Sequence, residues 1–122
     1  MKSVLILCNQ GPIGSNSTFE AIRLGTGFLE LGEEIFCQII LYGDAVLSVR
    51  SNLKPKEIGG DSSDESFEMV DLSELQIFLV KEDIESRGMH ENEIFDFEKP
   101  VKIISQNEIG ELIEKFDTVF HI

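Results

Sequence analysis

The fold is decided by residues 2–20, which read KSVLILCNQGPIGSNSTFE. The apolar run 2–8 is typical of a central strand that is buried on both faces. Turn-forming residues follow at 9–16, and Ser17 and Glu20 then fit the two ends of a helix capping box. The stretch therefore predicts a strand, a turn and the beginning of a helix, which is a common opening of an α/β protein.

The helix that begins near Ser17 is expected to bury a stripe of apolar side chains against the sheet. Gly25 and Gly27 lower the helix propensity, and we interpret them as a means for the helix to approach the sheet closely. Gly32 is expected to end the helix. The predicted stripe follows the helical period and consists of Ala21, Leu24, Phe28 and Leu31.

The rest of the chain continues the alternation of strands and short helices. A short helix is expected at 45–49, another at 82–87, and a third begins at Ser105, with Glu108 completing a capping box. Residues 52–66 lack periodicity, so we expect a mobile acidic loop at about 53–66 within one domain that spans 1–122. Further strands are expected at 34–42, 75–80, 101–104 and 117–122. This order predicts an α/β fold with a five-stranded, mainly parallel sheet and helices on both faces.

The charge of the chain argues against two classes of partner. The formal net charge is −13, and residues 61–122 carry seventeen acidic and only five basic side chains. Such a surface repels nucleic-acid phosphates and anionic membranes, so we expect neither partner. A basic protein partner, or solubility alone, would explain the acidity. The apolar run near the N-terminus is too short for a signal peptide or a membrane span, so a cytoplasmic location is expected.

Functional residues are expected beyond the carboxyl ends of the strands, in the loops 9–17, 42–50 and 80–90. The first loop enters a helix N-terminus, where backbone N–H groups and the helix dipole favour an anion. A well-capped turn without a ligand is the competing interpretation. No metal site or cofactor is predicted. The ligand-binding candidates are Asn9, Gln10, Gly11, Gly14, Ser15, Asn16 and Ser17, with Lys81 as a cation at the end of another strand.

Four segments resemble, in this order, the DsrE/DsrF-like family, which includes the TusD and TusC subunits. They are the first strand with its GPIG turn at 11–14, LYGDAV at 41–46, KEDIESRGM at 81–89 and FDTVFHI at 116–122. The resemblance implies a flavodoxin-like three-layer α/β/α fold. It also implies an assembly, either a homo-oligomer or a hetero-oligomer with related DsrE-like subunits, and a role in passing persulfide sulfur between proteins.

The resemblance also shows what this sequence lacks. In active members a cysteine lies at the end of the third strand, where a following helix N-terminus stabilises its thiolate. The corresponding stretch here, 77–81, reads IFLVK and contains no cysteine. Two other cysteines are present, and of these Cys37 is expected in the core, whereas Cys8 lies next to the 9–17 loop and is the tentative catalytic candidate.

Three functions remain as hypotheses. The favoured one is a subunit that is non-catalytic or binds a small ligand, in a system for intracellular sulfur transfer, and that is not itself an enzyme. The first alternative is a sulfurtransferase-type carrier that forms a persulfide on Cys8. The second is an FMN-binding electron carrier, which is disfavoured because the chain has no tryptophan and one tyrosine to stack on a flavin.

Overall fold

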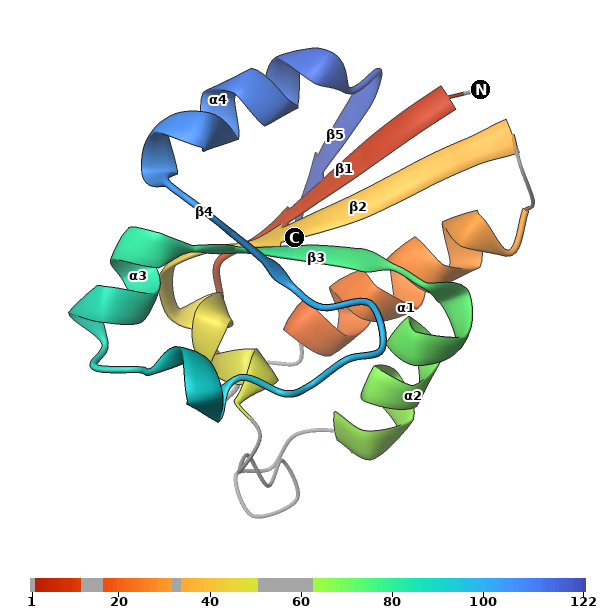
Figure 1. Cartoon of the computed structure of the whole chain (residues 1–122). Helices are drawn as coiled ribbons and strands as arrows, with labels where there is room; N and C mark the ends of the chain where they lie inside the picture. The colour runs from red at the N-terminus through yellow and green to blue at the C-terminus, as the bar shows by residue number, and fades with distance from the viewer. Residues whose placement is uncertain (1, 12–16, 32–33, 51–62) are drawn as a thin grey trace.

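The computed structural model describes residues 2–11, 17–31, 34–50 and 63–122 (Figure 1). Strands alternate with α-helices and two 3₁₀ helices, which are labelled η. The elements are β1 (Lys2–Cys8), α1 (Ser17–Leu29), β2 (Ile35–Leu41), η2 (Gly43–Val49), α2 (Ser63–Ser73), β3 (Gln76–Val80), α3 (Lys81–Ser86), η4 (Glu91–Glu93), β4 (Lys102–Ile104), α4 (Gln106–Lys115) and β5 (Thr118–His121). None of the helices in these described ranges is long and apolar enough to cross a membrane.

All five strands are parallel, in the order β4-β3-β2-β1-β5. β1 pairs with β2 along its full length, and on its other side it pairs with β5 from Val4 opposite Thr118 to Leu7 opposite His121. The chain thus moves outward from β1 to β4 and then returns to the free side of β1. The prediction of an α/β fold with a five-stranded parallel sheet is confirmed. The reversal places the topological switch point of the sheet between β1 and β5.

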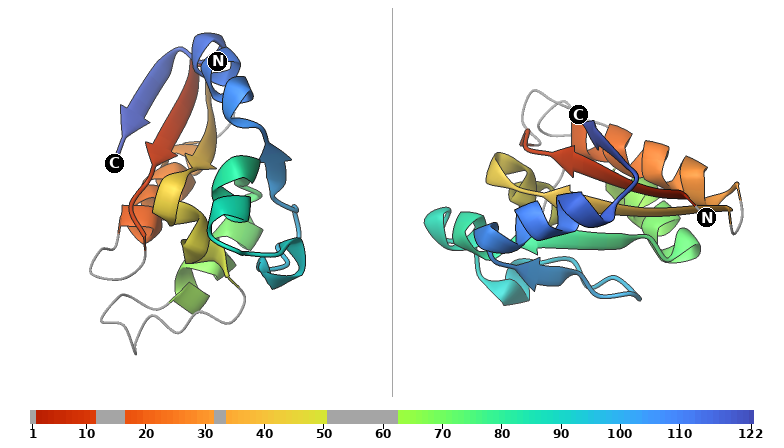
Figure 2. Two further views of the ribbon diagram at one scale, coloured as in Figure 1. Left: turned by 90° about the vertical axis from the view of Figure 1, so that its left-hand side faces the viewer. Right: turned by 90° about the horizontal axis from the view of Figure 1, so that it is seen from above.

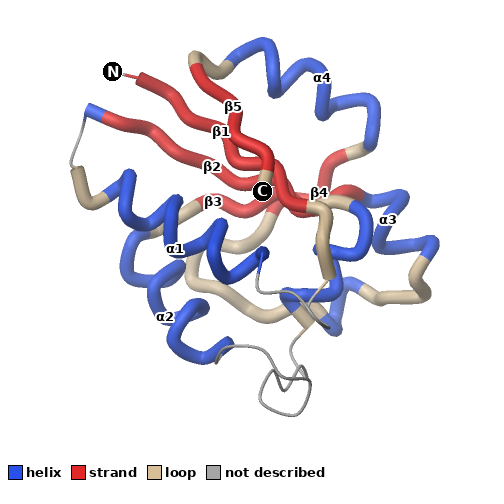
Figure 3. Tube along the Cα trace, turned by 180° about the vertical axis from the view of Figure 1, so that it is seen from behind, coloured by secondary structure: helices blue, strands red, loops and turns tan. Residues whose placement is uncertain are grey.

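The sheet is the middle of three layers. Figures 1 and 2 show α1 and α2 on one side of it and α4 on the other, and the same separation is visible from behind in Figure 3. Alternate residues of β1 enter different cores, because successive side chains of a strand point to opposite faces. Ile6 belongs to the core under α1, whereas Leu5 belongs to the smaller core under α4.

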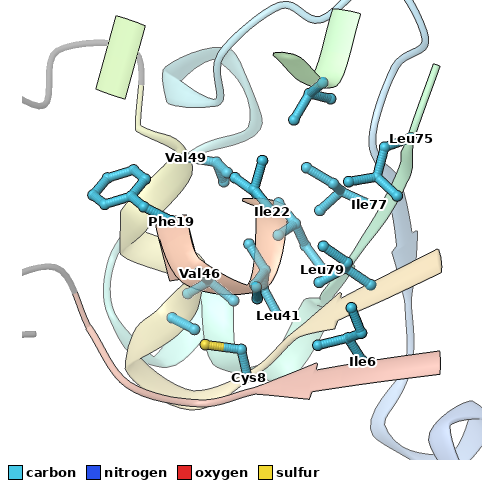
Figure 4. Packing of buried hydrophobic residues seen from close by; sticks show 14 of the residues in the cluster. Ile6, Cys8, Phe19, Ile22, Leu41, Val46, Val49, Leu75, Ile77 and Leu79 are labelled. Atoms are coloured by element: carbon cyan, nitrogen blue, oxygen red, sulfur yellow. The ribbon is translucent and has the colours of Figure 1, made fainter. Parts of the chain in front are cut away.

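The larger core contains the side chains that hold α1 on the sheet. Phe19 and Ile22 of α1 belong to one core with Ile6, Leu41 and Leu79 of three neighbouring strands, and all five are at most 1% exposed. Figure 4 shows Ile22 between Leu41 and the side chains of β3. Burial of each such side chain contributes about 1.5–3 kcal/mol relative to an exposed one. This packing fixes α1 beside the carboxyl end of β1.

The predicted buried stripe of α1 is wrong in two of its four positions. Leu24 and Leu31 are 38% and 63% exposed. The helix is rotated so that Gly25 faces the sheet, where an added Cβ would lie 3.3 Å from the side chains of Ile39 and Leu75. A small residue at the point of closest approach therefore decides the orientation, which apolar spacing alone does not reveal. The buried positions are Thr18, Phe19, Ala21, Ile22, Gly25 and Thr26.

The predicted acidic loop at 53–66 overlaps a helix that the sequence analysis missed. Residues 53–62 lie outside the described residues, but 63–66 belong to α2. The polar start of this helix was interpreted as part of the loop, because its apolar residues are few. Two of them, Phe67 and Val70, are buried, and Phe67 packs on the ring of Phe95 at a centroid distance of 4.6 Å. Tertiary packing thus stabilises a helix with weak local signals.

Other local predictions hold within one or two residues. The capping box at Ser105 is present, since the Glu108 carboxylate accepts a hydrogen bond from the Ser105 amide at 3.4 Å. The last strand is shorter than expected, and all four of its residues are exposed. β5 is nevertheless anchored at its start, because Asp117 Oδ2 accepts a hydrogen bond from the Ser3 amide at 2.8 Å. This bond is the main cause of a lowered pKa of Asp117.

The two glycines of α1 provide a test of this packing. Gly25→Val is expected to lower the free energy of unfolding by about 1–3 kcal/mol, because the new side chain is forced against Ile39 and Leu75. Gly27→Val is the matched control, since nothing lies within 4 Å of a Cβ at this exposed position, and its effect is expected to stay within about 0.5 kcal/mol. Urea unfolding measures both. Equal effects of the two substitutions would contradict the close approach at Gly25.

Candidate functional site

The carboxyl ends of β1, β2 and β5 meet at the switch point of the sheet. The Tyr42 amide donates a hydrogen bond to the Cys8 carbonyl at 3.0 Å, and the Ile122 amide donates to the Leu7 carbonyl at 2.9 Å. In open parallel sheets, ligands bind in the crevice outside this edge, where the strand order reverses. The candidate site therefore begins at the turn that follows β1.

Two of the three predicted loops are brought together at this edge. Gly43 has a φ of +56°, a conformation that favours glycine, and its Cβ position lies 3.4 Å from the Asn9 carbonyl oxygen. A Cβ on Gly11 would lie 3.1 Å from Cβ of Asp44. These close approaches pack the turn after β1 against the turn after β2. The backbone of residues 9–11 is thereby fixed beside the start of η2.

The predicted ligand-binding residues fall into two groups. Gly14, Ser15 and Asn16 lie outside the described residues, so their role stays a prediction. Gln10 and Ser17 are bonded to each other, because Ser17 Oγ donates to Gln10 Oε1 at 3.1 Å. Thr18 Oγ1 also donates to the Gln10 carbonyl at 3.5 Å. These bonds connect the end of β1 to the first turn of α1 and order the described ends of the loop.

The third predicted loop joins the same edge through an acidic and basic network that the sequence analysis missed. Asp83 Oδ2 of α3 accepts a hydrogen bond from the Gly43 amide at 2.9 Å. Arg87 Nε donates to Asp44 Oδ1 at 2.9 Å, and Arg87 Nη1 lies 3.5 Å from Asp83 Oδ1. The spacing of Asp83 and Arg87 at i and i+4 was a signal available in the sequence. The network fixes α3 relative to η2.

A second missed feature is a contact across β1. The Tyr42 hydroxyl is hydrogen-bonded to Nε2 of His121. Tyr42 follows β2 and His121 ends β5, and these two strands lie on opposite sides of β1. Partial burial, and to a smaller extent the neighbouring Cys8, raise the pKa of Tyr42. Tyr42 therefore stays a neutral hydroxyl well above physiological pH. No local sequence signal places the last strand beside β1, so this pair was not predictable.

The family comparison agrees with this arrangement. The family model described as "DsrE/DsrF-like family" matches residues 2–122. The chain belongs to the DsrE/DsrF-like family. This match confirms the resemblance on which the sequence analysis relied, and it covers every strand of the sheet.

The individual relatives have low sequence identity to this chain. The chain is 26% identical over 114 residues to protein YchN of Escherichia coli K12, which covers 93% of this chain and 88% of YchN. The crystal structure of ychN protein from E. coli superposes with a TM-score of 0.83 at 24% identity, with full coverage of both chains. MTH1491 from Methanobacterium thermoautotrophicum, a protein of unknown function, superposes with a TM-score of 0.72 at 10% identity, also with full coverage. At these identities the two structures support the fold alone.

In this DsrE/DsrF-like chain, the end of β3 holds no thiol. Val80 is fully buried in the core under α4. Lys81 begins α3, is exposed, and its Nζ lies 3.9 Å from Glu85 Oε1, a surface ion pair worth about 1 kcal/mol at most. β2 lies between β1 and β3, so Lys81 is two strand spacings, about 10 Å, from the turn after β1. Lys81 and the turn after β1 can therefore contact the same ligand only when that ligand spans the distance between them.

Both cysteines are inside the protein. Cys8 is 0% exposed and packs beside Val46 (Figure 4), with its Sγ 3.5 Å from Thr18 Oγ1. Cys37 is 2% exposed, and burial raises its pKa to about 12. A thiol that donates or accepts sulfur must be accessible to the sulfur atom of its partner. The Cys8 thiol is buried in this conformation and is not accessible. Among the described residues, no group of three or more His, Cys, Asp and Glu side chains is arranged to hold a metal ion.

Thiol reagents test this burial. Cys8 and Cys37 are expected to be unreactive toward Ellman's reagent at neutral pH, because both are buried and because Cys37 stays protonated there. In denaturing urea both are expected to react at once. The measurement is the thiol titre against time in the two conditions. A fast native reaction that Cys8→Ser abolishes would show that the Cys8 sulfur reaches the surface, in contradiction to the structure.

Proposed function

We propose that the chain is a non-catalytic or small-ligand-binding subunit that takes part in intracellular sulfur transfer without carrying the sulfur itself. The observation that supports this most is the end of β3. A buried valine and an exposed lysine occupy the stretch where the family resemblance places the reactive cysteine of active members. The burial of Cys8 adds support, because it leaves no thiol exposed at the shared edge of the described strands.

The ligand-binding part of the proposal depends on the turn after β1. Asn9 and Gln10 are exposed and follow β1 at the switch point, and Gln10 Oε1 accepts a hydrogen bond from Ser17 Oγ, at the first residue of α1. Backbone N–H groups at a helix N-terminus favour an anion. The network of Asp83, Arg87 and Asp44 fixes the neighbouring loop, so the described part of this edge keeps a defined shape.

The proposal also includes assembly with further copies or with related DsrE-like subunits. β5 is an edge strand, and its four residues are all exposed on both faces. Val119 and Phe120 are 37% and 41% exposed, which leaves apolar surface beside an open strand edge. An edge of this kind pairs readily with another chain. We therefore place the subunit contact at β5.

A persulfide assay tests the loss of sulfur carriage. The wild-type chain is expected to gain no mass after incubation with a cysteine desulfurase and cysteine, because it exposes no thiol. Lys81→Cys is expected to gain the mass of one sulfur atom, since the new thiol begins α3 at the family's position. Intact-protein mass spectrometry measures both. Lys115→Cys is the control for solvent exposure alone, because it places an exposed thiol at the C-terminal end of α4. It is expected to react more slowly.

The same assay decides against the proposal in one clear case. A stoichiometric sulfur adduct on the wild-type chain that Cys8→Ser removes would establish the carrier function of Cys8. The subunit would then be reactive, and the burial of Cys8 would have to be relieved by a partner or a conformational change.

Sedimentation tests the assembly. The wild-type chain is expected to sediment as an oligomer, and Val119→Lys is expected to shift it toward the monomer, because a charge is placed in the apolar contact at β5. Leu72→Lys is the matched control, since Leu72 is also exposed, at 80%, but lies on α2. A monomeric wild-type chain, or equal dissociation of both variants, would contradict a contact at β5.

A further inference from the structure

The two edge strands of the sheet differ in how they are protected against pairing with another chain. β4, at one edge, has Lys102 within it and Pro100 two residues before it. Proline and lysine are common means by which edge strands avoid such pairing. β5, at the other edge, contains neither, and its four residues are all exposed. Of the two edges, β5 is therefore the one suited to pair with another strand.

β5 is also an uncharged part of an acidic chain. The formal net charge is −13, yet residues 118–122 contain no acidic residue, lysine or arginine. Val119 and Phe120 are exposed apolar side chains on this strand. Phe120 stacks with Phe28 of α1 at a centroid distance of 6.0 Å, and the exposed Leu24 lies one turn before Phe28 on the same helix. A second copy thus meets an apolar surface without like charges on this strand, although two acidic chains repel each other elsewhere.

The strand is fixed at both ends before any partner binds. At its start, Asp117 accepts a hydrogen bond from the Ser3 amide, and at its end the Ile122 amide donates to the Leu7 carbonyl at 2.9 Å. An edge that is already ordered loses little conformational entropy when another strand is added. β5 is therefore a preformed surface for strand addition.

The pairing with β1 decides which backbone groups of β5 face outward. In a parallel ladder, one residue directs both its N–H and its C=O to the neighbouring strand, and the next residue directs both away from it. The Ile122 amide is bonded to β1, so by this alternation Phe120 and Thr118 also face β1. Val119 and His121 therefore direct their backbone groups to the open side, where no strand lies within the described ranges.

These outward groups restrict how a second copy can pair. Two identical strands related by a two-fold axis run antiparallel, and opposite side chains lie on the same face of the joined sheet. With the axis at Phe120, Val119 of one copy is opposite His121 of the other, and the two exchange backbone hydrogen bonds. An axis at Val119 would instead place His121 opposite Asp117. The Asp117 amide is already bonded, because it donates to Ser3 Oγ at 2.9 Å.

We propose that two copies of this chain pair through β5 in antiparallel orientation, with the two-fold axis at Phe120. Two sheets of five strands thereby join into one sheet of ten. The two Phe120 side chains lie next to each other on the face covered by α1, where Phe28 and Leu24 extend the apolar contact. This inference rests on the assembly part of the proposed function, and it specifies the partner and the register of that contact.

Disulfide cross-linking tests the register. At the axis the two copies of residue 120 form a non-hydrogen-bonded pair with Cα atoms about 4.5 Å apart, a distance that a disulfide spans. Phe120→Cys is therefore expected to shift to the mass of a covalent dimer in oxidised glutathione, measured by intact-protein mass spectrometry. Thr118→Cys is the matched control on the same strand and face. It is expected to remain a covalent monomer, because its equivalent lies about 13 Å away along the strand. The native cysteines are buried and do not interfere.

A second pair of variants leaves Phe120 in place. A mixture of Val119→Cys and His121→Cys is expected to cross-link, since the two positions are opposite each other with Cα atoms about 5.5 Å apart. Each variant alone is expected not to cross-link, because identical positions lie about 8 Å apart, beyond the reach of a disulfide.

Three results would overturn the proposal. They are cross-linking of Val119→Cys alone, equal cross-linking of Thr118→Cys and Phe120→Cys, and no cross-link in either Phe120→Cys or the mixture. Sedimentation separates this failure from that of the proposed function. An oligomer that Val119→Lys dissociates, but that lacks the expected cross-links, would retain the contact at β5 and remove the register. The persulfide assay is independent of both results.

Discussion

β1 is the strand on which the rest of the structure depends. It pairs with β2 along its full length and with β5 from Val4 to Leu7, and its side chains enter the cores on both faces. The two halves of the chain therefore share one strand. This double pairing brings the end of the chain beside the first turn, so that Tyr42 and His121 meet across β1. It also creates the switch point at which a ligand crevice is expected.

Because the chain returns to β1, both edges of the sheet are incompletely covered by helices. The connection from β4 to β5 must cross β3, β2 and β1, and of the described helices α4 covers that face (Figure 2). β5 is left exposed beyond the helix. On the opposite face, α1 and α2 occupy the middle of the sheet, and an extended segment instead of a helix covers the region near β4. This one topology thus has two consequences at opposite edges of the sheet. They are the exposed strand β5 and a groove beside β4, whose lining includes Phe95, Val101 and Ile103.

The sequence predicts this fold wherever a local pattern is dictated by burial. Continuous apolar runs located the strands within one or two residues, and the capping pair Ser105 and Glu108 located α4. Patterns failed where a distant contact decides. The rotation of α1 follows from Gly25 against Leu75, and α2 is stabilised by Phe67 against aromatic residues of a later segment. The three loops were predicted at one edge, where the structure brings them together, but their bonds to His121 and Arg87 depend on strand order.

The structure also explains why the fold does not depend on which side chain begins α3. Lys81, the first residue of α3, is held in place by later residues of the helix and not by its own side chain. Asp83 accepts a hydrogen bond from the Gly43 amide, and Arg87 bonds Asp44, so the start of α3 is fixed to η2 from the helix interior and its end. Lys81 projects from this frame and contributes only a surface ion pair. Exchange of the side chain at this position is therefore expected to have little effect on the stability of the fold.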